Sequence, residues 1–340
     1  MTRGPLLRGE FFRAHRFCIA PMMDWTDRHC RFFLRLISRR ARLYTEMITA
    51  PALVHGDVAH HLDFDPAEHP LALQLGGSDR AQLAHAARLG ERWGYDEINL
   101  NCGCPSERVQ TGSFGACLMR EPMLVADCVK AMRDAVALPV TVKHRIGLDA
   151  DNDYGFVRDF VGNVARAGCD VFIVHARNAV LKGLSPKENR EIPPLRYEVV
   201  RKLKHDFPAL TIVLNGGLTD YGAIEHEIEH IDGVMVGRVA YHDPYWLAQA
   251  DWHLFADEMP TRSRAEVLHA MMSYARTQTA HGTPLRAITR HMLGLYHGQS
   301  NGRLFRRILS DADKLGSSDV RVLADALTVV EPKFSEEATA

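Results

Sequence analysis

Residues that can bind anions, donate protons or act as nucleophiles follow one another along residues 17–240, each at the end of a short apolar run. In chain order they are Pro21, Met22 and Met23; Glu46; Gln74; Asn101 with Cys104; Lys143 with Arg145; His175 with Arg177; Asn215, Gly216 and Gly217; and Gly237 with Arg238. A protein with only a structural role has no reason to place such residues at these positions. The pattern therefore favours a binding or catalytic site.

The last two of these segments indicate a phosphate site. Glycines such as Gly216 and Gly217 let the backbone approach an anion closely, and an arginine such as Arg238 binds phosphate oxygens in pairs. Either segment alone is as readily a turn or a surface cation. Their succession after two neighbouring apolar runs favours the phosphate site.

Lys143 and His175 lie inside apolar runs, PVTVKHRI and FIVHAR. A buried lysine needs a partner. Three roles are open for Lys143: a structural ion pair, a cation that stabilises negative charge on a ligand, and a Schiff-base amine. A lone His175 would more readily be a core histidine. Beside the two glycine-containing segments, we expect it to contact a ligand.

Cys104 follows an apolar run in NLNCGCPSERVQTGSFG, a loop rich in Gly, Pro and Ser. A thiol is mainly protonated at neutral pH and can therefore act as a general acid. The neighbouring Cys102 raises metal binding as an alternative, but no second His/Cys pair stands at zinc-site spacing, so we expect no metal. Walker A, H-E-x-x-H and G-x-S-x-G patterns are absent from the sequence, so hydrolase chemistry is not indicated.

The apolar runs themselves predict eight strands. They span 17–22, 43–48, 71–76, 97–101, 140–146, 171–176, 211–216 and 234–237. Several lack polar alternation, as buried parallel strands do. Helical patterns lie between them at 79–93, capped by Ser78 and ending near Gly94, and at 124–136, 157–167 and 197–204, with a short candidate at 57–61.

Eight βα units within about 240 residues match a TIM barrel, whose active site lies at the C-terminal ends of the strands. The competing fold is a doubly wound sheet, but no G-x-G-x-x-G follows the first strand. Beyond residue 257 only helical patterns occur, at 265–278, 285–296, 304–311 and 320–327. We therefore expect a TIM-barrel catalytic domain at 1–257, a small helical domain at 258–331 and a loose tail at 332–340.

The charge of the chain is unevenly distributed. The total of 41 Lys/Arg and 42 Asp/Glu gives a net charge of −1, which by itself argues against a nucleic-acid partner. Residues 261–310, however, hold eight Lys/Arg and only the acid Glu266, or +7, which leaves −8 for the rest. The segment could be an ordinary solvated helix surface. The scarcity of acids instead favours a basic face for a phosphate backbone.

Targeting and disulfide signals are absent from the sequence. No apolar run approaches the ~20 residues of a membrane span, and the charged N-terminus does not resemble a signal peptide. The seven cysteines are an odd number without a framework pattern, which favours reduced thiols. We expect a cytoplasmic location, no membrane association and no obligate protein partner.

Together these motifs resemble the tRNA-dihydrouridine synthases. APMMDWTDRHCR, LALQLGGSD, EINLNCGCP, VTVKHRIG, HARNAVLKGLSPKENREIPPL, NGG and DGVMVGR occur in the order and spacing of that family, and ITRHMLGLYHG is similar to its helical domain. The resemblance extends over residues 16–327. LSPKENREIPPL points to the A-type bacterial subfamily, which acts on U20 and U20a of the tRNA D-loop. One departure is Cys102, where the family usually has an apolar residue.

The resemblance implies a bound FMN that NADPH reduces. FMN would contact Pro21, Met22, Met23, Gln74, Lys143, His175, Asn215, Gly216, Gly217, Gly237 and Arg238. Hydride would pass from the reduced flavin to uracil C6, and Cys104 would protonate C5. Asn101 would contact the target nucleotide, while Lys187, Arg190, Arg303 and Arg306 would orient the tRNA.

Two other functions compete with this one. A flavin-dependent barrel could reduce a small free molecule such as a pyrimidine or an enone, but such a substrate needs no basic helical segment. A nucleic-acid-binding module with a vestigial barrel would not need the full series of residues at the strand ends.

Overall fold

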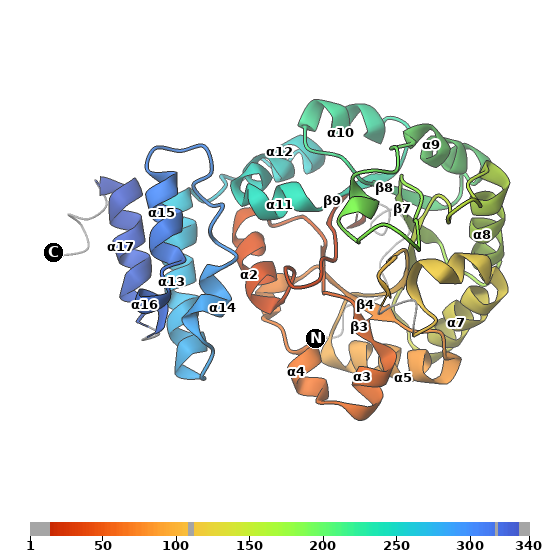
Figure 1. Cartoon of the computed structure of the whole chain (residues 1–340), viewed down its shortest axis with the longest axis horizontal. Coiled ribbons are helices and arrows are strands. Elements are labelled where there is room, and N and C mark those ends of the chain that lie inside the picture. The colour runs from red at the N-terminus through yellow and green to blue at the C-terminus, as the bar shows by residue number, and fades with distance from the viewer. Residues whose placement is uncertain (1–13, 108–111, 317–318, 333–340) are drawn as a thin grey trace. The chain divides into compact units, whose positions relative to one another are not determined.

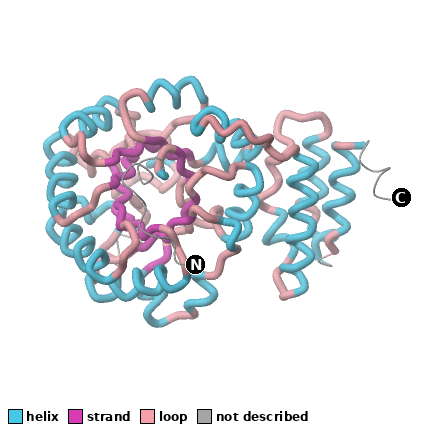
Figure 2. Tube along the Cα trace, turned by 180° about the vertical axis from the view of Figure 1, so that it is seen from behind, coloured by secondary structure: helices cyan, strands magenta, loops and turns pink. Residues whose placement is uncertain are grey.

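A parallel β-sheet closed into a barrel is the central feature of the computed structural model, which describes residues 14–107, 112–316 and 319–332 (Figures 1 and 2). Its strands are β1 Phe17–Ile19, β2 Leu43–Tyr44, β3 Ile48–Thr49, β4 Leu71–Gly76, β5 Glu97–Cys102, β6 Val140–Arg145, β7 Val171–His175, β8 Thr211–Asn215 and β9 Gly233–Val236. The strand order is β1-β9-β8-β7-β6-β5-β4-β2, and β3 also pairs with β4.

Backbone contacts of Arg42 close the barrel between its first and second strands. Arg42 N donates to Phe17 O at 3.0 Å, and Ile19 N donates to Arg42 O at 2.9 Å. Since β2 and β3 are two parts of the second predicted strand, the eight predicted strands are all present. The predicted TIM barrel is therefore confirmed, and an open doubly wound sheet is excluded.

Most helices of the barrel follow the predicted pattern, and they form the layer outside the strands in Figure 2. They are α3 Ala50–His55, α4 Val58–Leu62, α5 Arg80–Trp93, α7 Pro122–Ala135, α8 Tyr154–Arg166, α9 Tyr197–Asp206 and α10 Tyr221–Ile228. The prediction that Ser78 caps α5 is wrong: the carboxylate of Asp79 accepts from Gln82 N. Gly94 ends α5 in the left-handed region, at φ 92°, as expected for a C-terminal glycine.

The chain divides into two compact units. One holds the residues up to Met23 together with Arg42–Val236, and the other holds Asp24–Ala41 with Gly237–Ala340. The second unit contains α2 Arg28–Ile37, α11 Arg238–His242, α12 Ala250–Phe255, α13 Arg264–Ala280, α14 Leu285–Thr289, α15 Gly302–Leu309, α16 Ala312–Gly316 and α17 Arg321–Val330. A domain boundary at 257/258 stays a prediction, and residues 333–340 of the predicted loose tail lie outside the described residues.

One predicted helix of the second unit is much shorter than expected. The pattern at 285–296 predicted a continuous helix, but α14 ends at Thr289. The next two side chains, Arg290 and His291, each contact Asp27 Oδ2 at 2.9 Å, an arrangement that holds this segment against the N-terminus of α2. A Cβ on Gly294 would lie 2.5 Å from His242 O, so the backbone there runs too close to a neighbour for a larger residue.

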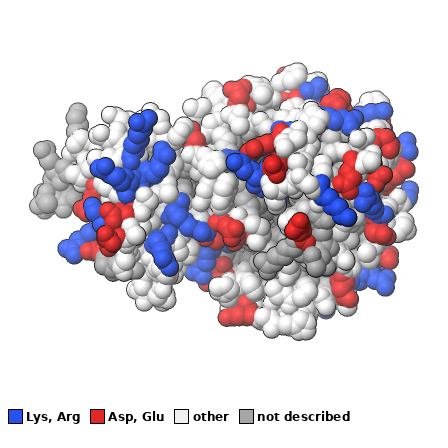
Figure 3. Space-filling view, in the orientation of Figure 1, with Lys and Arg blue, Asp and Glu red and all other residues white. Residues whose placement is uncertain are grey.

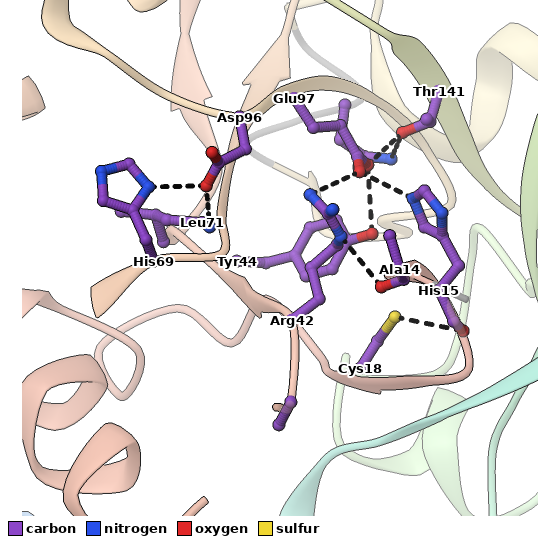
Figure 4. Close-up of polar contacts among 12 residues, drawn as sticks. Ala14, His15, Cys18, Arg42, Tyr44, His69, Leu71, Asp96, Glu97 and Thr141 are labelled. Atoms are coloured by element: carbon purple, nitrogen blue, oxygen red, sulfur yellow. Dashed lines mark hydrogen bonds and ion pairs between the residues drawn. The ribbon is translucent and has the colours of Figure 1, made fainter. Parts of the chain in front are cut away.

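The interior of the barrel is apolar on one side and polar on the other. The apolar cluster comprises Cys18, Ala20, Tyr44, Ala72, Val171, Ile173, Val213 and Met235. Facing positions on β5 and β6 are instead polar, and at their base the buried carboxylate of Glu97 contacts Arg42, His15, Tyr44 and Thr141 (Figure 4). Burial favours a neutral Glu97, but His15 and Arg42 outweigh it and hold the pKa of Glu97 at about 2.

No helix among the described residues is long and apolar enough to cross a membrane.

Candidate active site

The register of the strands brings the predicted site residues to one edge of the barrel. Asn101 of β5 pairs with Lys143 of β6, and His175 of β7 pairs with both Arg145 of β6 and Asn215 of β8. Gln74 of β4 pairs with Asn99, two residues before Asn101. Because side chains alternate along a strand, Lys143, His175 and Asn215 share the inward side with Thr141, Ile173 and Val213. These predicted residues therefore lie together at the C-terminal ends of neighbouring strands.

Asn101 holds the loop that carries Cys104. Its Oδ1 accepts from Gly103 N at 3.1 Å and from Cys104 N at 3.0 Å, while its Nδ2 donates to Gln74 Oε1 at 2.9 Å. Cys104 is half-buried, its carbonyl accepts from Ala116 N at 2.9 Å, and its thiol lies 3.5 Å from Ser106 Oγ. The thiol thus sits on an anchored turn directly after the strand.

Cys102 differs from Cys104 in its surroundings. It is fully buried, and burial raises the pKa of its thiol well above the usual value, with smaller contributions from Cys128, Cys169 and Cys117. A buried thiol held neutral is a poor nucleophile. Cys102 therefore contributes to packing, and Cys104 is the more accessible of the two thiols.

Lys143 is a cation without an anionic partner among the residues that the structure describes. Burial lowers the pKa of Lys143 to about 7, and the positive charges of Arg145 and Arg190 contribute to the lowering, against an opposing effect of Cys104. A structural ion pair, one of the roles left open by the sequence, is thus not found in the described chain. A ligand with negative charge would stabilise the ammonium form of such an amine.

Arg145 was named with Lys143 among the residues that end the apolar runs, but no contact with FMN or tRNA was predicted for it. Its Nε donates to Gly103 O at 3.2 Å, and its Nη1 donates to Asn178 O at 3.2 Å and Asn189 O at 2.9 Å. It is buried and satisfied by carbonyl oxygens, and no carboxylate of the described chain compensates its charge. The signal that could have assigned it to the site is the K-x-R spacing, which places both cations on the inward side of β6.

His175 stands beside these cations and packs against the glycine pair after β8. Burial, followed by the charges of Arg145 and Lys143, lowers the pKa of His175 well below its usual value, so the ring is neutral. Gly216 and Gly217 have φ angles of 115° and 72°, and a Cβ on Gly216 would lie 2.6 Å from His175 Cδ2. Only glycine fits this conformation and this close approach. The backbone after β8 is therefore shaped as an anion-binding turn requires.

The side chain of Asn215 links β8 to β9 at this edge of the barrel. Its Nδ2 donates to Met235 O of β9 at 2.8 Å, and Tyr197 donates its hydroxyl to Gly216 O at 2.6 Å. These contacts fix the backbone immediately before and within the glycine pair. Any anion bound there meets a preorganised turn.

The segment after β1 contributes an apolar side chain to the same barrel. Met22 packs partly buried against the apolar interior cluster, whereas Met23 is 52% exposed. Pro21 lies between them and the strand, half-buried. Met22 is thus the one of the three that the structure places directly on the barrel interior.

A well-anchored loop carries Lys187 and Arg190. The buried amide of Asn189 accepts from Val180 N at 2.7 Å and donates to Val180 O, Leu184 O and Ser185 O at 2.9–3.3 Å. Lys187 precedes the 3₁₀ turn Glu188–Arg190, Arg190 is its last residue, and both side chains are exposed. Two surface cations are therefore presented by a loop whose centre is fixed.

Four predicted residues belong to the second unit. Gly237 directly follows β9 and Arg238 opens α11. Arg303 and Arg306 lie on α15 and line a surface hollow of about 480 Å³ with Tyr296, His297, Gly298, Gln299 and Gly302. Figure 3 shows Lys and Arg side chains gathered on this part of the helical unit. Within the described residues, neither Arg303 nor Arg306 is paired with a carboxylate.

Taken together, the barrel edge offers cations, neutral hydrogen-bond donors, a glycine turn and one thiol, a set that suits a bound anionic ligand and a proton transfer. These features define a barrel enzyme with its active site at the C-terminal edge of the strands. Comparisons with known proteins give the family.

The family model described as "Dihydrouridine synthase (Dus)" matches residues 18–331. A tRNA-dihydrouridine(20/20a) synthase of Xanthomonas campestris is 59% identical and covers 87% of this chain and 88% of its own. The proteins of the same name from Pseudomonas putida and Salmonella typhimurium are 56% and 54% identical, covering 93% and 97% of this chain and 92% and 99% of their own. The chain belongs to the dihydrouridine synthase family and is an oxidoreductase, as its resemblance to that family implied.

A solved structure supports the fold independently. Morphinone reductase superposes with a TM-score of 0.52 over 74% of this chain and 88% of its own, at 11% sequence identity. At that identity the likeness concerns the barrel alone. The individual roles of the site residues stay predictions.

We predict that Lys143 reacts as an amine at neutral pH. Its pKa of about 7 leaves roughly half of it neutral at pH 7, whereas an ordinary lysine has a pKa near 10.5. Competitive labelling with acetic anhydride between pH 5 and 11, followed by mass spectrometry, measures the midpoint. Arg145→Met should move the midpoint upward, but not to 10.5, because burial is the larger cause. A midpoint above 10 in the wild type would contradict this description of the site.

Proposed function

We propose that this protein is an FMN- and NADPH-dependent tRNA-dihydrouridine synthase that reduces the C5=C6 bond of uridines 20 and 20a in the tRNA D-loop. The observation that carries the proposal is the high identity, over nearly the whole chain, to proteins named tRNA-dihydrouridine(20/20a) synthase. The charge and geometry at the barrel edge support it.

The residues at the barrel edge fit a flavin mononucleotide. A phosphate suits the Gly216–Gly217 turn, whose backbone admits close approach, and the family resemblance adds Gly237 and Arg238 to the proposed contacts. Lys143, without an anionic partner in the described chain, would face the N1/C2 edge, where negative charge collects on a reduced flavin. The further proposed contacts are Pro21, Met22, Met23, Gln74, His175 and Asn215. Binding such an anion raises the pKa of Lys143, because it stabilises the ammonium form.

FMN, when bound and reduced by NADPH, supplies the hydride for C6 of the uracil. The protein must then deliver a proton to C5. Cys104 is the proposed donor, because it lies on a turn anchored at the same edge and carries a proton as a thiol. Addition of one hydride and one proton saturates the C5=C6 bond, and the thiolate recovers its proton from solvent.

Asn101 would contact the target base with a defined polarity. Its Oδ1 already accepts two backbone N–H groups, so the hydrogen bond it has left to offer is an N–H of Nδ2. The carbonyl oxygens of uracil are acceptors that this donor suits. The target base must leave its stack to reach the barrel edge.

Exposed cations would hold the tRNA. Lys187 and Arg190 lie on the anchored loop of the barrel unit, and Arg303 and Arg306 lie on α15 of the helical unit. Guanidinium groups on one helix face bind successive phosphates. A reductase of small free molecules, the alternative function, gives no reason for the charge difference between residues 261–310 and the rest of the chain.

We predict that Cys104→Ala lowers the rate of dihydrouridine formation in tRNA by between about 10²- and 10⁴-fold, the range typical of a general acid. FMN content and NADPH oxidation in the absence of tRNA should stay near wild type. The measurement is mass spectrometry of nucleosides from purified tRNA after incubation with enzyme and NADPH.

The matched control is Cys117→Ala, which removes another half-buried thiol, one that faces Phe114 O. Full activity of Cys104→Ala would remove Cys104 from the mechanism. An inactive wild type, with unmodified tRNA as substrate, would refute the proposed function itself.

We predict that Arg303→Glu combined with Arg306→Glu weakens tRNA binding and lowers the slope of log Kd against log salt by roughly 1 for each phosphate that the protein no longer binds. FMN binding should be unchanged. Arg158→Glu with Arg166→Glu is the control, because it reverses two exposed arginines on α8 and changes the net charge by the same amount. Equal weakening by both pairs would show that only net charge matters.

A further inference from the structure

A continuous chain of side-chain hydrogen bonds runs through the barrel interior to the turn of Cys104. Beginning at that turn, Asn101 Nδ2 donates to Gln74 Oε1 at 2.9 Å, and Gln74 Nε2 donates to Asn99 Oδ1 at 2.7 Å. Asn99 Nδ2 then donates to Thr141 Oγ1 at 2.8 Å, and Thr141 donates its hydroxyl to Glu97 Oε1 at 2.6 Å. All five side chains are buried. The chain joins the base of the barrel to its catalytic edge.

The direction of this chain is fixed at both ends. At the base, an ionised carboxylate can only accept, so the hydroxyl of Thr141 must donate to Glu97. At the edge, the backbone N–H groups of Gly103 and Cys104 can only donate, so Asn101 must present its Oδ1 to them. The ends therefore impose the same direction from opposite sides.

The orientations of the side-chain amides between the two ends are determined by these constraints. A hydroxyl has one proton, and Thr141 gives it to Glu97, so Thr141 must accept from Asn99 Nδ2. Asn99 then presents Oδ1 to Gln74 Nε2, and Gln74 presents Oε1 to Asn101 Nδ2. Reversing any one amide would set donor against donor or acceptor against acceptor in a buried place, where an unsatisfied polar group is strongly destabilising.

The charge at the base is itself well fixed. Glu97 Oε2 contacts His15 Nε2 at 2.7 Å and Arg42 Nη1 at 3.2 Å, and Tyr44 donates its hydroxyl to Oε1 at 3.1 Å (Figure 4). Arg42 in turn donates from Nε to Ala14 O at 3.1 Å. Glu97 thus stays an acceptor for Thr141, and the polarity of the chain is constant.

We propose that Glu97 and Thr141 are positioning residues: through Asn99 and Gln74 they orient the amide of Asn101, which holds the Cys104 turn and leaves an N–H for the substrate. The consequence for catalysis rests on the proposed function. The orientation itself is a property of the barrel and is testable without substrate or cofactor.

Thr141→Val tests this proposal with little change of shape. Valine neither donates nor accepts, so Asn99 loses its acceptor and the direction of the chain is no longer imposed from the base. We expect the backbone amides of Gly103 and Cys104 to exchange with solvent deuterium at least about fivefold faster, as loss of one ordinary hydrogen bond implies. NMR of protein labelled with 15N-glycine and 15N-cysteine measures both amides, and dihydrouridine formation at saturating tRNA should fall about tenfold.

The rescue variant is Thr141→Ser, which keeps the hydroxyl and should restore slow exchange and activity. Thr211→Val is the matched control, because Thr211 is a buried threonine of β8 that takes no part in this series of hydrogen bonds. It should leave the exchange rates of the Gly103 and Cys104 amides unchanged. Asn99→Leu breaks the chain at the next link and should reproduce the effect, so the test does not depend on one variant folding. Glu97 is not mutated, because its removal would leave the buried Arg42 without its anionic partner.

Three results would overturn the proposal: unchanged exchange in Thr141→Val, faster exchange spread equally over all barrel strands, or no rescue by serine. An inactive wild type would refute the proposed function but not the exchange result. Normal wild-type activity with unchanged exchange in both Thr141→Val and Asn99→Leu would refute only this inference.

Discussion

The contact between Arg42 and Glu97 inside the barrel is the interaction on which most of the structure depends. The backbone of Arg42 closes the sheet between β1 and β2, and its guanidinium reaches Glu97 at the start of β5. A buried ion pair gains stability only when its remaining hydrogen-bonding groups are satisfied, and here His15, Tyr44 and Thr141 satisfy the carboxylate. Closure of the barrel and the polar side of its interior thus share one pair of residues.

The distribution of charge follows from this arrangement. The carboxylate at the base of the barrel is neutralised by Arg42, whereas Lys143 and Arg145 at the C-terminal edge have no carboxylate partner among the described residues. Arg145 is held in place by carbonyl oxygens, which leave its charge uncompensated, and an anionic ligand beside the buried Lys143 would favour its charged form. An edge of this kind binds an anion and stabilises negative charge that develops during a reaction.

Much of the fold could be predicted from the sequence, because buried parallel strands are apolar runs and the polar residues that end them mark the active edge. The register then brings together Asn101, Lys143, His175 and Asn215. Several helices were not predicted, namely α2, α3, α10, α11, α12 and α16, and α14 stops where Arg290 and His291 contact Asp27.

The chain of side-chain hydrogen bonds in the barrel interior was also not predicted, although the sequence of β5 contains a pattern that indicates it. Glu97, Asn99 and Asn101 alternate along EINLN and therefore face the same side. Their partners Gln74 and Thr141 come from two other strands, and only the register shows that they meet.

Whether the C-terminal edge of the barrel reduces uridine in tRNA is most directly tested by mapping dihydrouridine in tRNA from cells that lack this protein. We expect loss of dihydrouridine at positions 20 and 20a, restored by the wild-type chain and not by Cys104→Ala; unchanged dihydrouridine at both positions would contradict the proposed function.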